Sequence, residues 1–376
     1  MKLITIVLII CVLGLLAIGL VVLYSVSPLD DSFRLVSRQL LACAIGLAGA
    51  TWAAARLDYR QLQQYSKPMY VLALVMLILV LIPGVGTAAN GARRWFRLAG
   101  FQCQPSDFAK LALIVAVANY AARNQRFMQT FKSGLVLPAG MIGPMLVLIF
   151  LEPDWGTAVL LAVVTGIMLC VGGVRLPYVI PPMVLGLVGF VVLLALNPMR
   201  SDRLYSWLNL EETKDGIGYQ AWQARIALGA GGPRGVGLDK STQKTYVPEK
   251  TTDFIYAVIA EEFGYVGSLA LVTAFVTMFL CSLAIAWRAP DAFGLLLGTG
   301  LSFLIALQAF INVAVVSGAF PNKGLSLPFV SYGGTNLMIM LLCIGILISI
   351  GRASVEATEA RSSSPSLEQI PLTHLA

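Results

Sequence analysis

The chain has 376 residues, of which 58% are hydrophobic and only 12% are charged, and its formal net charge is +7. With a mean hydropathy of +0.82, this composition excludes a soluble globular protein, in which about a quarter of the residues are charged. The single histidine, His374, lies in a polar tail, which excludes histidine-based acid–base catalysis and histidine metal sites. The six cysteines are scattered singly, which excludes a disulfide framework or a cysteine metal site.

Ten apolar segments follow one another along the chain, and a helix needs about 17–25 apolar residues to cross a bilayer. They are Leu3–Tyr24, Val36–Ala54, Met69–Ile82, Phe108–Ala121, Leu135–Leu151, Thr157–Val171, Tyr178–Leu196, Phe254–Trp287, Phe293–Val316 and Leu327–Ile350. The third, fourth and sixth are short, so their ends are the least defined. The first is too long for the core of a signal peptide and no small-residue cleavage site follows it, so we expect it to be retained. The sequence predicts an all-α polytopic membrane protein with about ten transmembrane helices.

Positive charge predicts the orientation of these helices. With ten spans both termini share one side, and that side carries eleven cations, namely Lys2, Arg56, Arg60, Lys67, Arg123, Arg126, Lys132, Arg175, Arg288, Arg352 and Arg361. Cytoplasmic loops are enriched in lysine and arginine, so both termini are predicted to be cytoplasmic. Residues 1–352 then form one transmembrane domain, with a long extracytoplasmic loop at residues 197–252 between the seventh and eighth helices. Residues 353–376 form a cytoplasmic tail that we expect to be disordered.

The stretch "GARRWFRLAGFQCQPSDFAK", residues 91–110, carries unexpected cations on the outer side. Three arginines, Arg94 among them, flank Trp95 and Phe96, and Lys110 falls inside the start of the next span. A cation in a span needs a cavity or a partner, arginine forks match phosphate oxygens, and tryptophan favours the headgroup level. The pattern indicates an external site for an anionic lipid headgroup. The alternative is an interfacial belt that only anchors the helix.

Two further connections lie on the same side. In "LEPDWGTA", residues 151–158, Asp154 either caps the next helix or pairs with a cation or with substrate. Within residues 218–244, the first half fits a short amphipathic helix on the surface. The second half, "GAGGPRGVG", lacks the strand and the Gly-Lys-Ser/Thr ending of a nucleotide-binding loop. It is therefore predicted to be a flexible or closely packed loop.

The stretch "YVPEKTTDFIYAVIAEEFG", residues 246–264, places Glu249 and Asp253 immediately before the eighth apolar run. Asp253 suits the N-cap of that helix, and a carboxylate at a membrane boundary is also suited to act as a general base. The helix dipole would lower the pKa of Asp253 and desolvation would raise it, so the sequence leaves both readings open.

The stretch "NVAVVSGAFPNKGLSLPFVSYGGTN", residues 312–336, carries Lys323 and Ser331 through a turn that contains proline and glycine. Irregular backbone at membrane depth is tolerated where protein buries it or a wet cavity satisfies it. Close helix packing or such a cavity is therefore expected around "SYGG".

In this order, these stretches resemble the SEDS family (shape, elongation, division and sporulation), whose members include FtsW and RodA. The resemblance spans about Leu13 to Ile350 and rests on "GARRWF" with "QPSDFAK", "PDWGTA", "GYQ" followed by "GAGG" and "GVGL", "VPEKTTDFIYAVIAEEFGYVG", and "PNKGLSLPFVSYGG". It implies a ten-helix peptidoglycan glycosyltransferase that polymerises lipid II at the outer face of the bacterial cytoplasmic (inner) membrane. The implied partners are a class B penicillin-binding protein and other proteins of the division or elongation complex, with no nucleic acid.

The resemblance also assigns roles to residues. Asp253 matches the catalytic carboxylate, and the positions assigned to substrate are Arg94, Trp95, Lys110, Asp154 and Glu249, to which we add Lys323 and Ser331. A base would take the proton of the attacking sugar hydroxyl while cations neutralise the departing pyrophosphate. No metal ligands are assigned and the sequence identifies no cofactor, while a divalent cation is compatible with this chemistry.

Some positions depart from the usual family pattern. They are Glu152 and Trp155, where Gln and Leu are common, Thr251 in place of His, Ser326 in place of Pro, and Thr335-Asn336 in place of two small residues. The sequences "PNKG" and "GLDKSTQK" are closer to the division-type FtsW than to RodA. Two other functions stay open at this point, a lipid II flippase and a non-catalytic scaffold for a penicillin-binding protein. Inverted repeats in the sequence would favour the flippase, and none are visible.

Overall fold

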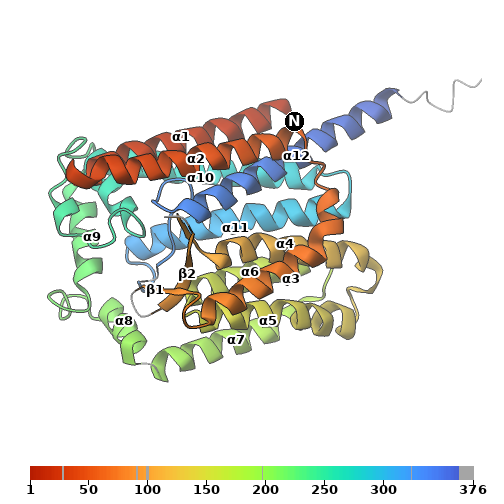
Figure 1. Cartoon of the computed structure of the whole chain (residues 1–376), viewed down its shortest axis with the longest axis horizontal. Coiled ribbons are helices and arrows are strands. Elements are labelled where there is room, and N and C mark those ends of the chain that lie inside the picture. The colour runs from red at the N-terminus through yellow and green to blue at the C-terminus, as the bar shows by residue number, and fades with distance from the viewer. Residues whose placement is uncertain (28, 90–91, 99–100, 197, 323, 364–376) are drawn as a thin grey trace, which may run out of the picture.

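The computed structural model shows a bundle of long helices that carries a small sheet and short helices at one end (Figure 1). It describes residues 1–27, 29–89, 92–98, 101–196, 198–322 and 324–363. Ten long helices match the ten predicted segments: α1 (Lys2–Val26), α2 (Leu29–Ala55), α3 (Gln61–Leu81), α4 (Pro105–Arg123), α5 (Leu137–Leu151), α6 (Trp155–Val171), α7 (Leu176–Leu196), α10 (Ile255–Trp287), α11 (Ala292–Val316) and α12 (Gly334–Ser363). The prediction of a polytopic helical membrane protein is confirmed.

Seven of these helices are long and apolar enough to cross a membrane by length and composition, counted over the described residues. They are α1, α2, α3, α5, α10, α11 and α12. Helix α6 and the stretch Leu176–Gly186 of α7 are apolar but shorter. Helix α4 contains Asp107, Lys110 and Arg123, yet its side chains are buried along most of its length. Because Asp107 and Lys110 are buried against protein rather than lipid, α4 can run inside the bundle.

A three-stranded antiparallel sheet corrects the all-α prediction. Strands β1 (Thr87–Ala89), β2 (Ala92–Leu98) and β3 (Phe101–Cys103) pair in the order β1-β2-β3. The sequence "ARRWFRL" of β2 carries two aromatic residues, which are favoured in strands. Neighbouring side chains of a strand point to opposite faces. The sheet therefore presents Arg94 and Trp95 on different sides.

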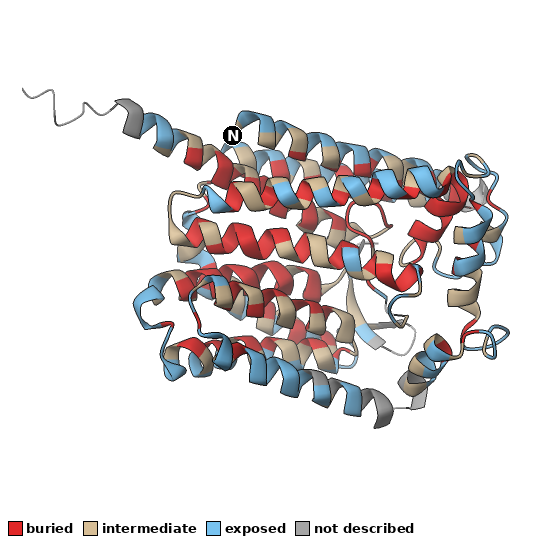
Figure 2. Cartoon of the chain, turned by 180° about the vertical axis from the view of Figure 1, so that it is seen from behind, coloured by how far each residue is buried: buried red, intermediate tan, exposed pale blue. Residues whose placement is uncertain are grey.

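The two ends of the bundle differ. The N-terminus and the end of α12 lie together at one end (Figures 1 and 2). The sheet, α8 (Pro198–Leu208), α9 (Tyr219–Ala230) and the start of α10 lie at the opposite end, which we name the sheet end. Helix α11 is buried along its length in the middle, whereas α7 is exposed at the periphery (Figure 2). The predicted site residues that the structure describes belong to segments at the sheet end.

The last helix differs from its prediction at both ends. Helix α12 begins at Gly334 rather than Leu327, because residues 319–322 and 324–333, which contain Pro321 and Pro328, form bends, turns and irregular backbone. It continues to Ser363, so residues 353–363, which the sequence assigns to the tail, are helical. Residues 364–376 lie outside the described part of the chain.

The predicted helix at the start of residues 218–244 is present as α9, and the glycine-rich half packs closely against α10. Gly264 interrupts α10 with φ 68° and ψ −165°, which glycine adopts without strain. A Cβ on Gly264 would lie 2.2 Å from the backbone nitrogen of Gly235, and a Cβ on Gly235 would lie 2.1 Å from the carbonyl oxygen of Glu262. Only glycine fits at either position, so this half of the loop is closely packed.

Two carboxylates inside the eighth apolar run hold the same loop. Glu261 accepts hydrogen bonds from the backbone N–H groups of Thr242 (3.0 Å) and Gln243 (3.2 Å) and from the hydroxyls of Ser241 and Thr242. Glu262 accepts from the hydroxyl of Ser25 at the end of α1 and from the backbone N–H of Asp239 (3.2 Å). A carboxylate that accepts several hydrogen bonds can be buried. These glutamates therefore connect the loop to α10 and α1.

Candidate functional site

Asp253 lies in a turn at the sheet end, two residues before α10 begins. The N-cap of α10 is Phe254, which makes no side-chain capping bond, so the N-cap reading of Asp253 is wrong. The turn is closed by Glu249, whose carbonyl accepts from the backbone N–H groups of Thr252 (3.1 Å) and Phe254 (3.2 Å). Among the described residues, no hydrogen bond reaches the carboxylate oxygens of Asp253. The side chain is therefore left available for another molecule.

The surroundings of Asp253 raise its pKa to about 7. Burial is the largest cause, and the negative charges of Glu249 and Asp154 act in the same direction, whereas Arg94 and Arg203 lower the pKa. Desolvation thus outweighs any helix-dipole effect, which the sequence could not decide. A carboxyl group with a pKa near neutral is well suited to take a proton from a hydroxyl and to release it again.

The backbone before Asp253 is tied to the segment between α11 and α12. Ser331 donates its hydroxyl to the carbonyl of Thr252 (2.6 Å) and accepts from the backbone N–H of Leu327 (2.8 Å). Tyr332 donates its backbone N–H to the carbonyl of Thr251 (2.8 Å). Ser331 is buried, and its hydroxyl is used within the protein. In this structure its contacts shape the loop that carries Asp253.

Arg94 joins the sheet to the link between α5 and α6. Its guanidinium donates through Nε to the carbonyl of Glu152 (2.8 Å) and through Nη2 to that of Pro153. Its charge also acts on Asp253 and on the Glu152 carboxyl. Arg94 is therefore held near Asp253 by the backbone of a different segment. Trp95 beside it is partly buried, and its carbonyl accepts from the hydroxyl of Thr87 (2.8 Å).

The α5–α6 link carries two buried carboxyl groups. Asp154 is the N-cap of α6 and accepts from the backbone N–H of Thr157 (3.3 Å), so the capping reading is confirmed. It also accepts from the side chain of Gln104 (3.2 Å). Glu152 is fully buried, and neither of its carboxylate oxygens has a hydrogen-bond partner among the described residues. Burial first, and then the charge of Asp154, raise the pKa of Glu152 to about 9, so this carboxyl is neutral at pH 7.

Lys110 is buried in a polar centre between α4, α11 and α12. Its ammonium lies 2.9 Å from Asp107 Oδ1, and the side-chain oxygens of Asn336 (3.3 Å) and Gln308 (3.4 Å) accept from it. Thr335 donates to the other oxygen of Asp107 (2.9 Å). The partner that a cation in a span requires is therefore Asp107. A direct contact between Lys110 and substrate stays a prediction.

Two predicted residues, Glu249 and Lys323, and the question of a metal site remain to be described. Glu249 is exposed, has φ 51°, and accepts from the hydroxyl of Thr252 (2.9 Å). Lys323 lies outside the described residues. No group of three or more His, Cys, Asp or Glu side chains is arranged to hold a metal ion within the part of the chain that the structure describes.

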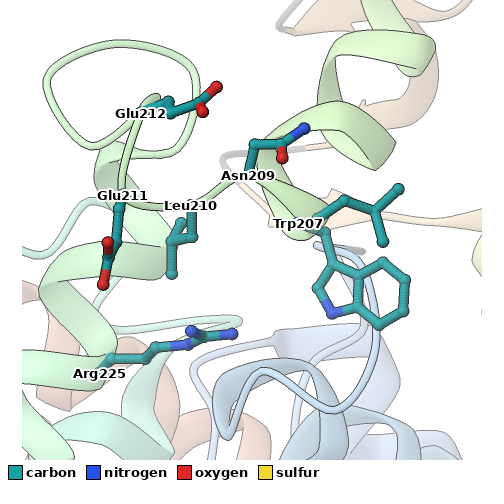
Figure 3. Close-up of a pocket in the computed structure, with 7 residues that line it drawn as sticks. Trp207, Asn209, Leu210, Glu211, Glu212 and Arg225 are labelled. Atoms are coloured by element: carbon teal, nitrogen blue, oxygen red, sulfur yellow. The ribbon is translucent and has the colours of Figure 1, made fainter.

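Sequence reasoning missed Arg203 on α8, whose charge acts on Asp253. Arg203 lines a narrow hollow with Asn322, and this hollow shares Trp207, Leu210 and Arg225 with a larger open one. The larger hollow, of about 440 Å³, lies between the end of α8 and α9 (Figure 3). The long loop contains many cations, and no sequence signal distinguishes Arg203 from the others.

This architecture defines a polytopic membrane protein with a carboxylate of raised pKa and neighbouring arginines at one end of its helix bundle. The family model described as cell cycle protein, for FtsW, RodA and SpoVE, matches residues 1–356. The chain belongs to this family.

Curated relatives and solved structures agree with this assignment. Stage V sporulation protein E of Bacillus subtilis is 38% identical over 354 residues, covering 92% of this chain and 96% of the relative. A probable peptidoglycan glycosyltransferase FtsW of Trichlorobacter lovleyi is 38% identical over 351 residues, covering 92% of each chain. Among solved structures, a chain of a peptidoglycan synthase complex aligns with a TM-score of 0.76 at 29% identity, covering 92% of this chain and 97% of that one. The rod shape determining protein RodA of Thermus thermophilus aligns with a TM-score of 0.70 at 27% identity, covering 92% and 95%.

Proposed function

We propose that this protein is a peptidoglycan glycosyltransferase that polymerises lipid II, with Asp253 as the general base. The observation that carries the proposal is the Asp253 carboxylate, which no described residue hydrogen-bonds and whose pKa is raised to about 7 beside Arg94 and Arg203. Relatives at 38% identity include an FtsW whose name gives this activity as probable. A peptidoglycan precursor supplies the two groups that such a site needs, a sugar hydroxyl and a departing pyrophosphate.

The reaction follows from the charges around Asp253. Its carboxylate takes the proton of the attacking sugar hydroxyl, and the hydroxyl oxygen forms a bond to the anomeric carbon of the second sugar. The bond between that carbon and the lipid pyrophosphate breaks, and the pyrophosphate leaves with the electron pair. Arg94 and Arg203 lie where positive charge would stabilise this anion as it forms.

The remaining predicted residues fit this scheme in different ways. Trp95 would meet the lipid near the headgroup, and Glu249 and Asp154 keep the base protonatable at neutral pH through their charge. Lys110 and Lys323 stay candidates for contact with the pyrophosphate. For Lys110 such contact would require the ammonium to reach substrate from its ion pair with Asp107.

The positive charge at the opposite end of the bundle supports an orientation in which the sheet end faces the outer side of the cytoplasmic membrane. A partner that crosslinks glycan strands, of the class B penicillin-binding type, would meet the protein there. The solved chain that this protein resembles belongs to a peptidoglycan synthase complex that coordinates polymerisation and crosslinking.

The test is incubation of the purified full chain with lipid II, with and without a co-purified partner, followed by separation of glycan products. Polymer that forms with the native chain and not with Asp253→Asn supports the proposal. Translocation of the lipid headgroup without polymer would show a flippase instead, a function that a helix bundle with buried charges can also serve. Polymer only from the partner would leave this chain as a scaffold.

A further inference from the structure

Helix α11 carries two buried amides on one face, Gln308 and Asn312, which are one turn apart. Both donate to carbonyl groups of the extended segment 324–327 that precedes α12. Gln308 Nε2 donates to the carbonyl of Ser326 (2.9 Å), and Asn312 Nδ2 donates to that of Leu325 (2.7 Å). The pair fixes this segment against α11.

The second bond of Asn312 reaches the turn before α10, whereas that of Gln308 reaches Asn336 (3.3 Å). Asn312 Nδ2 donates to the backbone carbonyl of Asp253 (2.8 Å). Both partners are carbonyl oxygens, so the nitrogen and not the oxygen of the amide must face them. Both hydrogens of one nitrogen are therefore used, on two segments that lie about seventy residues apart in the sequence.

The same segment supports the carboxylate of Asp253 itself. A Cβ built on Gly324 would lie 2.6 Å from Asp253 Oδ2, so the carboxylate rests against the backbone at this glycine. Residue 324 directly precedes Leu325, which Asn312 binds. Asn312 thus holds the backbone of the base and the surface on which its carboxylate rests.

We propose that Asn312 is a positioning residue for Asp253, because it joins the aspartate to the 324–325 backbone and so sets the direction of its carboxylate. This inference rests on the proposed function, in which Asp253 is the base. The other ties of the turn, from Ser331 and Tyr332, reach only residues 251 and 252. Loss of the Asn312 amide would leave the turn attached at residues 251 and 252 and would release the carbonyls of Asp253 and Leu325.

The test compares Asn312→Ala with Asn119→Ala in the purified full chain with lipid II. Asn119 is a matched control, because it is buried in α4 and donates to Ser66 on α3 (2.6 Å), away from Asp253. Both variants lose one buried amide and should melt at similarly lower temperatures. Only Asn312→Ala should lower kcat, by about a hundredfold, with KM little changed, since misplacement by about 1 Å has effects of this size.

The pH dependence of kcat separates positioning from a general loss of structure. The charged groups that act on Asp253 are Glu249, Asp154, Arg94 and Arg203, and both variants leave them in place. Burial is the main cause of the raised pKa, so a released carboxylate gains water and its pKa falls. The acid limb of the profile should therefore move to lower pH in Asn312→Ala and stay unchanged in Asn119→Ala.

Gly324→Ala provides a second arm that does not depend on how Asn312→Ala folds. The added methyl group pushes directly on the carboxylate, whereas Gly143→Ala on α5 meets no atom within 4 Å and serves as its control. We expect a lower kcat and a displaced acid limb for Gly324→Ala only. Unchanged kcat and acid limb in both site variants would overturn the positioning role. Full activity of Asp253→Asn would overturn the proposed function, and this inference with it.

Discussion

The stretch from Asp253 to Glu262 contains three carboxylates that differ in their hydrogen bonding. Glu261 accepts four hydrogen bonds from residues 241–243, and Glu262 accepts from Ser25 and Asp239. Asp253 accepts none from the described residues, although its backbone is held at three consecutive positions. Glu261, whose two oxygens both accept hydrogen bonds, holds the loop to α10, whereas Asp253, which lies near the charges of Arg94 and Arg203 without such bonds from the described residues, is the candidate for chemistry.

The largest effect on polymerisation is expected at Asp253, where a substitution separates a role in the reaction from a role in stability. Asp253→Asn keeps the shape of the side chain and removes the base, so we expect lipid II polymerisation to fall by about 10²–10⁴-fold. The thermal unfolding temperature and binding of lipid II should change little, because no described group depends on this carboxylate for a hydrogen bond. Product analysis and a binding assay on the same preparation measure both. Polymerisation close to the native rate would remove Asp253 from the mechanism.

Arg94→Ala should have the next largest effect. It removes a positive charge beside the departing pyrophosphate, and loss of one such group typically lowers turnover by about 10²-fold or more. It also frees the carbonyls of Glu152 and Pro153, so the link between α5 and α6 should loosen. Arg94→Lys keeps the charge but not the two-pronged contact and should recover only part of the rate. Equal rates for the lysine and alanine variants would show that charge at this position is unimportant.

Glu261→Gln should show the reverse of Asp253→Asn. The amide nitrogen cannot accept from the hydroxyl of Ser241, and the bonds from Thr242 and Gln243 to the retained oxygen lose their charged acceptor; a hydrogen bond to a charged group contributes about 1.5–3 kcal/mol. We therefore expect a lower unfolding temperature and faster proteolysis of residues 231–246, with activity reduced only as far as the folded fraction falls. Calorimetry and limited proteolysis measure this, and an unchanged unfolding temperature would contradict the assigned role.

The smallest effect on polymerisation is expected for a substitution of Glu152. Its pKa is raised from 4.5 to about 9 on folding, so the folded chain binds more protons than the unfolded one in this range. Stability that depends on the neutral carboxyl is then present at low pH and falls as the pH rises from 4.5 to about 9. Glu152→Gln should flatten this slope and leave polymerisation near native. Unfolding temperatures across the pH range, native against variant, are the measurement.

Hydropathy was enough to predict the ten helical segments, because a bilayer imposes a length on every apolar helix. The small sheet was missed because the seven residues "ARRWFRL" do not alternate clearly between polar and apolar. In a membrane protein, their arginines were also interpreted as part of a surface rather than of a strand. The helical start of the tail was missed because its Ser- and Glu-rich composition indicates exposure to solvent. Such a composition does not prevent a helix that is already formed from continuing into the tail.

The site was predictable as a set of residues and not as a set of contacts. The family motifs pointed to Asp253, Arg94 and Asp154, which the structure brings together. The ion pair of Lys110 with Asp107 has an i, i+3 spacing that the sequence contains, but its burial depends on α11 and α12. Arg203, Asn312 and Gly324 come from segments far from Asp253 in the sequence, so only the folded chain shows that they meet.

The dependence of kcat/KM on pH, measured with lipid II well below its KM, tests the central claim most directly, because kcat/KM reports the pKa of the protein before substrate binds. Because Asp253 must be ionised to take a proton and its pKa is raised to about 7, kcat/KM should rise with pH and reach half of its plateau near pH 7. An acid limb centred near 3.8, the ordinary pKa of an aspartate, or a kcat/KM independent of pH across this range, would contradict the account.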